Sequence, residues 1–236
     1  MVRANLDRLL SARPSLVIAG LCVVAALFPA ASGGYARAPS CGPAGAQTLA
    51  ADHVARVYRV TTGPGELGTV YNYYGCTAGS DKSRLLVASA NSLPGARVYG
   101  CAGSGCRLVR AIHLVGAAVG FIVEDHGLDT VSTALSVRDL ADGHVLHSVR
   151  ANTVVGYGER LTTYVLAPSG NIAWATVTTS RGTDGTVRRA ATIHRAIGQR
   201  VLTLDSGPGV RALSLRLRGD TVEWIDRGGR QTASLP

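Results

Sequence analysis

The chain has 236 residues, a formal net charge of +9 and 46% hydrophobic residues. That length suits one domain with a sizeable core. Arginine supplies nearly all of the positive charge, with Lys82 as the single lysine, and few aromatic residues stand between the arginines. Because base stacking needs such aromatic residues, we expect no nucleic-acid partner.

The N-terminal 38 residues have the pattern of an export signal. Its basic residues are Arg3, Arg8 and Arg13, and an apolar run follows over residues 16–28. An A-x-A cleavage site stands at Ala36-Arg37-Ala38. The apolar run is shorter than the ~20 residues of a membrane-spanning helix. We therefore expect cleavage that leaves residues 39–236 as a single domain, secreted or held in the cell envelope. The alternative is a retained anchor. The signal before cleavage would be the only contact with the membrane.

Four cysteines would remain after cleavage, namely Cys41, Cys76, Cys101 and Cys106. An even number in an exported chain indicates disulfides, and four cysteines allow three pairings. We favour Cys41–Cys76 with Cys101–Cys106, because the glycines between the last two permit a tight turn. The C-x4-C spacing, with no histidine beside it, does not fit a metal site.

Short runs of Val, Thr, Leu and Tyr, broken by Gly, Pro and Asp-Gly, predict β-strands along this domain. In chain order the expected strands are 69–76, 84–88, 134–140, 145–149, 191–195, 200–204, 213–218 and 221–225. Residues 124–129 are expected to form a polar loop. In 213–218 the alternation predicts that Leu213, Leu215 and Leu217 share one buried face.

One phrase recurs about every fifty residues, a spacing typical of stacked supersecondary units. It reads L-x-G-x-x-V-x-F over 114–121, L-x-G-x-x-V-x-W over 217–224, and has one extra residue over 166–174. We count three clear units, the last of them truncated, and one degraded unit at the front. The fold class predicted is all-β, with antiparallel propeller-like units in an open or partial propeller. The alternative is a two-sheet β-sandwich.

Residues 99–236 resemble secreted actinobacterial proteins with β-propeller-like repeats. The phrases that carry the resemblance are 114–121, 137–143, 204–209 and 219–229, and Cys41 with Tyr74-Gly-Cys76 looks like the N-terminal cysteine pair of that group. These motifs are structural turns. The resemblance therefore implies a fold class and an exported location, and it implies no activity.

The phrase Leu204-Asp-Ser-Gly-Pro-Gly209 resembles parts of two protease signatures. In a trypsin-like enzyme Ser206 would be the nucleophile and would need a base such as His53 within hydrogen-bond reach. In a retropepsin-like enzyme Asp205 would share a proton with the Asp205 of a second copy. Asp, Ser, Gly and Pro are also the residues of tight turns. We favour the turn, so no catalytic residue is assigned.

The acidic residues and histidines lack metal-ligand spacing. Asp125, Asp129, Asp139 and Asp142 do not alternate as in a calcium loop, and Asp142-Gly143 fits a hairpin turn. The histidines without zinc spacing are His113, His126, His144, His147 and His194. We expect no metal and no cofactor.

Arginines crowd the C-terminal third, and Arg188, Arg189, Arg216 and Arg218 are the candidates for an anion-binding surface. The alternative is that they serve solubility only. The function predicted is a non-catalytic binding module of the cell envelope, with an anionic wall polymer or another envelope protein as partner. Its contacts would come from loops 124–132 and 179–187. One alternative is an extracellular hydrolase that uses Asp205 or Ser206. Another is one part of an oligomer that completes the ring.

Overall fold

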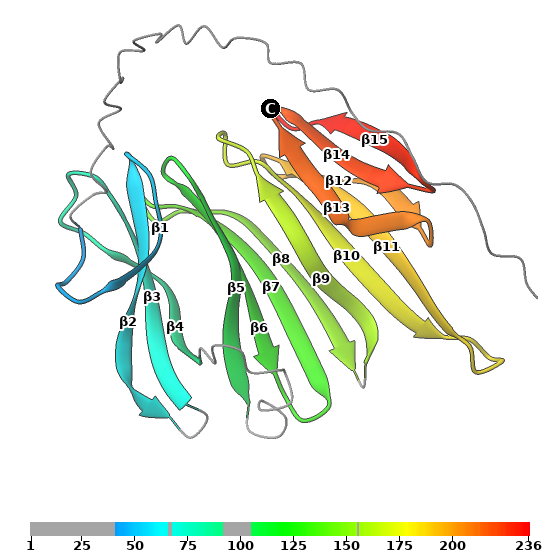
Figure 1. The fold of residues 1–236 in the computed structure, drawn as a ribbon, viewed down its shortest axis with the longest axis horizontal. Helices are drawn as coiled ribbons and strands as arrows, with labels where there is room; N and C mark the ends of the chain where they lie inside the picture. The colour runs from blue at the N-terminus through cyan, green and yellow to red at the C-terminus, as the bar shows by residue number, and fades with distance from the viewer. Residues whose placement is uncertain (1–40, 66–67, 92–104, 155) are drawn as a thin grey trace, which may run out of the picture. The chain divides into compact units, whose positions relative to one another are not determined.

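Every regular element among the described residues is an antiparallel β-strand (Figure 1). The computed structural model describes residues 41–65, 68–91, 105–154 and 156–236. The predicted signal peptide, residues 1–38, lies outside these ranges. All of these described residues belong to one compact unit. The prediction of an all-β fold is confirmed.

The first sheet has four strands in sequence order: β1 (Gln47–Ala51), β2 (Ala55–Gly65), β3 (Gly68–Thr77) and β4 (Arg84–Asn91). Its apolar side chains Val57, Tyr73 and Leu86 are buried together with Phe121, on a strand of the next sheet, and Leu140, in a turn between two strands of that sheet. One core therefore lies between the first two sheets.

The second sheet has eight strands and divides into two groups. The first group is β5 (Cys106–Val115), β6 (Ala118–His126), β7 (Thr130–Asp139) and β8 (Val145–Val154). The second group is β9 (Tyr157–Leu166), β10 (Ile172–Arg181), β11 (Val187–Ile197) and β12 (Arg200–Gly207). Strands β8 and β9 pair only through Thr153–Gly158 and Val154–Tyr157. The two groups are thus hydrogen-bonded at one end and separate along the rest of their length.

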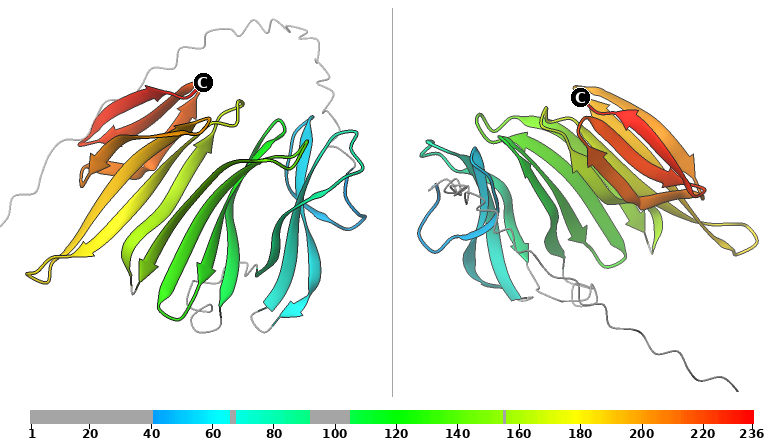
Figure 2. Two further views of the ribbon diagram at one scale, coloured as in Figure 1. Left: turned by 180° about the vertical axis from the view of Figure 1, so that it is seen from behind. Right: turned by 45° about the horizontal axis from the view of Figure 1, so that its top comes forward.

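A third sheet of β13 (Val210–Arg218), β14 (Thr221–Asp226) and β15 (Gly229–Ser234) packs beside β9–β12 (Figure 2). The predicted leucine face of β13 is partly wrong, because Leu213 is 71% exposed while Leu215 is buried. The register explains this difference. Residues 212–215 lie between the pairs Arg211–Ile225 and Arg216–Glu223, where β14 has only Trp224. The resulting bulge breaks the two-residue alternation.

The recurring phrase forms the first hairpin of three strand groups, namely β5–β6, β9–β10 and β13–β14. Its glycine occupies the left-handed region in each turn, with φ of 58° at Gly116, 84° at Gly170 and 56° at Gly219. Its aromatic residue, Phe121, Trp174 or Trp224, is buried. The phrase therefore recurs for two reasons: the turn needs a glycine in the left-handed region, and the core needs the aromatic side chain.

Polar side chains join successive strand groups. The Asp52 carboxylate accepts hydrogen bonds from the amides of Val54 and Ala55 and, at 2.9 Å, from the amide of Gly116 in the β5–β6 turn. The Tyr164 hydroxyl of β9 donates to the Ala111 carbonyl of β5 at 2.6 Å. These bonds fix the separation of the groups where strands do not pair.

Candidate functional site

A cavity of about 370 Å³ lies between strands β6–β8 and strands β9–β11. Its lining residues are His126, Asp129, Val131, Thr153, Gly156, Arg160, Thr162, Val177, Thr179 and Arg189. The cavity lies at the end of the sheet where β8 and β9 pair. The predicted contact loops 124–132 and 179–187 both contribute residues to it.

A single cross-strand row forms one wall of this cavity. Direct pairs in the register run in the order His126, Val131, Thr153, Gly158, Thr179 and Arg189. Directly paired residues of antiparallel strands point to the same face of the sheet. All members except Gly158 line the cavity. The pairing of six strands therefore places one histidine, two threonines and one arginine side by side.

Glu124 is the buried charge of the site. Its side chain is 1% exposed, and it forms ion pairs with Arg110 at 2.5 Å and Arg160 at 2.8 Å. The His126 ring lies 3.4 Å from its other carboxylate oxygen. Burial alone would raise the pKa of Glu124, but the hydrogen bonds and charges of Arg160 and Arg110 outweigh it and lower the pKa. The ionised carboxylate holds the Arg160 guanidinium at the cavity wall.

A second cavity, of about 470 Å³, shares His126 with the first. It is lined by Gly105, Cys106, Arg107, Asp125, His126, Gly127, Thr130 and Ser132. Arg107 donates to Asp125 at 2.7 Å, and both side chains are about half exposed (45% and 48%). This cavity therefore carries one balanced ion pair and two hydroxyl groups.

The four candidate arginines fall into two separate places. Arg189 lines the first cavity, and its exposed neighbour Arg188 is not among the lining residues. Arg218 pairs with Glu223 at 3.1 Å, and Arg216 donates to the carbonyls of Leu213 and Leu215.

Strand pairing shows how far Arg216 and Arg218 lie from Arg188 and Arg189. Arg218 pairs with Thr221, which pairs with Ser234, and the Ser234 carbonyl accepts a hydrogen bond from Arg195. Arg195 is six positions from Arg189 along β11, or roughly 20 Å. Of the four candidates, Arg189 lines the first cavity, while Arg216 and Arg218 lie away from it.

The residues of the hydrolase alternative have structural partners instead. Leu204–Gly207 belong to β12, so the predicted turn is confined to Pro208 and Gly209. The Asp205 carboxylate accepts a 2.7 Å hydrogen bond from the Trp224 indole of β14, and the Ser206 hydroxyl lies 3.0 Å from the Thr192 hydroxyl. His53 lies between β1 and β2 in the first sheet. Within the described ranges, no hydrogen bond joins His53 to Asp205 or Ser206.

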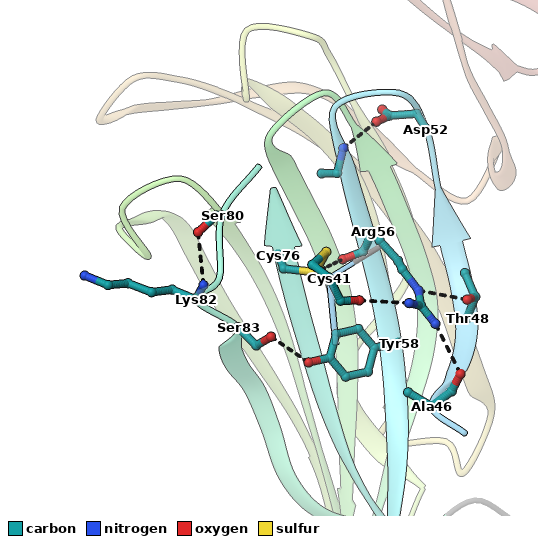
Figure 3. Close-up of a disulfide and its surroundings, with 11 residues drawn as sticks. Cys41, Ala46, Thr48, Asp52, Arg56, Tyr58, Cys76, Ser80, Lys82 and Ser83 are labelled. Atoms are coloured by element: carbon teal, nitrogen blue, oxygen red, sulfur yellow. Dashed lines mark hydrogen bonds between the residues drawn. A yellow bond between two sulfur atoms is a disulfide. The ribbon is translucent and has the colours of Figure 1, made fainter. Parts of the chain in front are cut away.

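The predicted Cys41–Cys76 disulfide is present, with the Cα atoms 6.2 Å apart (Figure 3). Beside it, Arg56 donates to the carbonyls of Cys41 and Ala46 and to the Thr48 hydroxyl, and this fixes the start of the domain against β2. The other predicted pair needs Cys101, which lies outside the described residues.

Among the described residues, no group of three or more His, Cys, Asp or Glu side chains is arranged to hold a metal ion. Asp139 and Asp142 instead accept backbone hydrogen bonds in the β7–β8 turn. No helix in the described part of the chain is long and apolar enough to span a membrane.

Sequence reasoning missed Glu124 and its arginines. The expected loop 124–129 is wrong at its start, because residues 124–126 belong to β6. A stretch with Glu, Asp and His looks exposed in sequence, and only Arg110 and Arg160, distant in the chain, make its burial favourable. The alternation after Phe121, which places Ile122, Glu124 and His126 on one face, was the available signal.

Comparison with protein-family models, with curated proteins and with solved structures finds no match to this chain.

Proposed function

We propose that the chain is a non-catalytic binding module of the cell envelope that holds an anionic group in the first cavity. The observation that carries the proposal is the placement of Arg160 and Arg189 at one cavity with Thr153, Thr162 and Thr179. Guanidinium groups form charge-assisted hydrogen bonds with carboxylates and phosphates, and the Thr179 hydroxyl supplies a further donor.

The charge balance supports an anionic ligand. Arg110, Arg160 and Arg189 stand against Glu124 and Asp129, which leaves one positive charge in excess. Arg189 forms no ion pair with any described residue. Its guanidinium is therefore available to a ligand.

The hydroxyl groups at the cavity support binding rather than catalysis. Thr153 donates to the Val131 carbonyl, and Thr162 donates to the Ala175 carbonyl. A nucleophile needs a base within hydrogen-bond reach. Within the described residues, no hydrogen bond joins the ring of His126, the histidine of the cavity, to the hydroxyl of Thr153 or Thr162.

The finer architecture is part of this proposal. The four strand groups β1–β4, β5–β8, β9–β12 and β13–β15 are read as propeller-like units, the last with three strands. Support comes from the common position of the recurring phrase and from contacts between the first strands, β1 with β5, β5 with β9 and β9 with β13. The disulfide is consistent with export to an oxidising compartment.

The test compares two neighbouring arginines. Calorimetric titration of the oxidised chain with glucuronate and with glycerol 3-phosphate, at low salt, is expected to give saturable binding. Arg189→Ala should weaken it about tenfold, because a charge-assisted hydrogen bond contributes about 1.5 kcal/mol or more. Arg188→Ala is the matched control and should leave the dissociation constant unchanged. Equal effects of the two substitutions, or no binding of either anion, would contradict the proposal.

A further inference from the structure

The β10–β11 hairpin extends past the strands on either side of it (Figure 1). Strand β9 pairs with β10 only as far as Thr179, and β12 pairs with β11 only from Ala191 onward. Residues 180–190 therefore pair only with one another, and none of these residues is buried. A two-stranded ribbon of this kind has no core of its own. Its side chains are accessible to a ligand on both faces.

Hydrogen bonds hold this ribbon in one conformation as far as its tip. The Gly182 amide donates to the Thr186 carbonyl, and the Asp184 carboxylate accepts from the amide and the hydroxyl of Thr186. The pairing of β10 with β11 continues without a bulge to the last pair, Arg181 with Val187. Strand alternation therefore decides to which face each side chain of the ribbon points.

The two faces of the ribbon differ in charge. Arg188 points to one face, and its guanidinium lies 3.9 Å from the Asp184 carboxylate. Arg181 and Arg189 point to the other face, because Arg181 is paired with Val187, which lies two positions before Arg189. Neither of these two arginines forms an ion pair with any described residue. This face of the ribbon therefore carries two uncompensated positive charges.

The same face continues the series of arginines that begins in the first cavity. Val177, Thr179 and Arg181 are successive residues of β10 on one face. Arg160 of β9 is paired with Val177, and Arg189 of β11 is paired with Thr179. The arginine row of Arg160, Arg189 and Arg181 thus advances along β10 by two residues, or roughly 7 Å, at each step. It leads from the cavity out onto the ribbon.

The opposite wall of the cavity does not continue this row. Asp129, from the turn between β6 and β7, lines the cavity there. Its carboxylate would repel further acidic groups of a ligand, whereas the ribbon would attract them. A ligand with more than one acidic group is therefore expected to leave the cavity along the ribbon.

We infer that the ligand is a linear polyanion with an acidic group on successive units, one held in the first cavity by Arg160 and Arg189 and the next held on the ribbon by Arg181. This inference rests on the proposed anion site and extends it by one contact outside the cavity. The acidic group is a carboxylate or a phosphate, since a guanidinium binds both.

The experiment measures how much affinity is gained when the charge is repeated. The oxidised full chain is titrated with galacturonate and its linear trimer, with glycerol 3-phosphate and its linear phosphodiester trimer, and with neutral maltotriose. We expect an acidic trimer to bind about tenfold more tightly than its monomer, because one more charge-assisted contact forms. Maltotriose should bind far more weakly. The series with the larger gain identifies the acidic group as carboxylate or phosphate.

Two neighbouring arginines locate the gain on one face of the ribbon. Arg181→Ala should reduce the affinity for the trimer to that for the monomer and leave the affinity for the monomer unchanged. Arg188→Ala, on the other face, is the matched control and should leave the tenfold gain intact. Both side chains are exposed, so neither substitution disturbs the core. A gain that survives Arg181→Ala, or equal effects of the two substitutions, overturns the contact on the ribbon.

The dependence on salt gives a second readout. Added salt should weaken trimer binding more steeply than monomer binding, because the additional contact is between exposed charges. Arg181→Ala should remove this difference, and equal salt dependence of trimer and monomer in the unmodified chain would overturn the inference.

Other outcomes separate this inference from the proposed function. Equal affinity for trimer and monomer in both series, with Arg189→Ala still weakening both, overturns the polyanion and leaves the anion site standing. Maltotriose that binds as tightly as the acidic trimers overturns the role of repeated charge. Failure of every acidic probe to bind overturns the proposed function and the inference together.

Discussion

Asp205 shows how a residue with a catalytic appearance in sequence acquires a structural role. Its carboxylate joins β12 to β14 through the Trp224 indole, which is 4% exposed. A buried indole donor without an acceptor costs free energy, because its hydrogen bond to water has been lost.

Asp205→Ala is therefore expected to lower the free energy of unfolding by about 1–2 kcal/mol. Ser206→Ala should cost less, since the Ser206 hydroxyl pairs with Thr192 at an exposed position. Chemical denaturation of both variants, followed by tryptophan fluorescence, gives the values. Loss of a peptide-hydrolysing activity in either variant, with stability unchanged, would support the hydrolase alternative instead.

The ionisation of Glu124 predicts how the stability of the protein depends on pH. The two arginines lower its pKa in the folded state below its ordinary value of 4.5, so the folded state releases this proton more readily than the unfolded state. The resulting stability is fully present above pH 4.5 and is lost as the pH falls through the lower, folded-state pKa.

Glu124→Gln should lower the free energy of unfolding at pH 7 by about 2 kcal/mol, because a charge-assisted network becomes neutral. It should also flatten the dependence of stability on pH below 4.5. Urea unfolding at a series of pH values tests both parts. An unchanged acid slope in the variant would show that Glu124 is not the titrating group.

At the scale of elements, turns and strand alternation could be read from the sequence where local chemistry decides them. The hairpins at Gly116, Gly170 and Gly219 are of this kind, because each needs a left-handed residue followed by a buried aromatic side chain. The exposed Leu213 could not be predicted, since the bulge depends on the register between β13 and β14.

The candidate site was partly predictable for the same reason. Arg189 and the two rim loops stood out by charge and by turn residues. The cavity itself exists because β8 and β9 pair at only two positions, and the two strand groups separate after those positions. Such long-range pairing leaves no local signal in the sequence.

Tyr164 connects the first strands of the two groups that flank this cavity. Its hydroxyl donates to the Ala111 carbonyl and accepts from the His113 amide at 3.1 Å, where the β5 backbone departs from regular pairing. Burial raises the pKa of the Tyr164 hydroxyl, so it stays protonated and keeps its donor.

Tyr164→Phe keeps the buried ring and removes both bonds, and it should lower the free energy of unfolding by about 2 kcal/mol. Tyr157→Phe, on the same strand, is the matched control, because no described residue hydrogen-bonds the Tyr157 hydroxyl. Hydrogen exchange of the β5 amides should increase in the first variant only. Equal behaviour of the two variants would show that Tyr164 does not join the strand groups.

At the scale of the whole molecule, ion pairs and hydrogen bonds decide which of the candidate arginines remain available to an anion. Arg216 and Arg218 are occupied by backbone carbonyls and by Glu223, whereas Arg189 stands at the cavity without an ion pair among the described residues. Net charge alone would attract anions to every basic face and be screened by salt. A specific binding site differs from this general attraction, because the ligand saturates it and the effect is confined to the residues of the site.

A backbone amide NMR titration of the oxidised chain with glucuronate at moderate salt tests the proposed anion site residue by residue. We predict saturable shifts along the cross-strand row of His126, Thr153, Thr179 and Arg189, with Arg216 and Arg218 unaffected. Small, non-saturating shifts spread over all exposed arginines, or no shifts in the row, would contradict a binding site at this cavity.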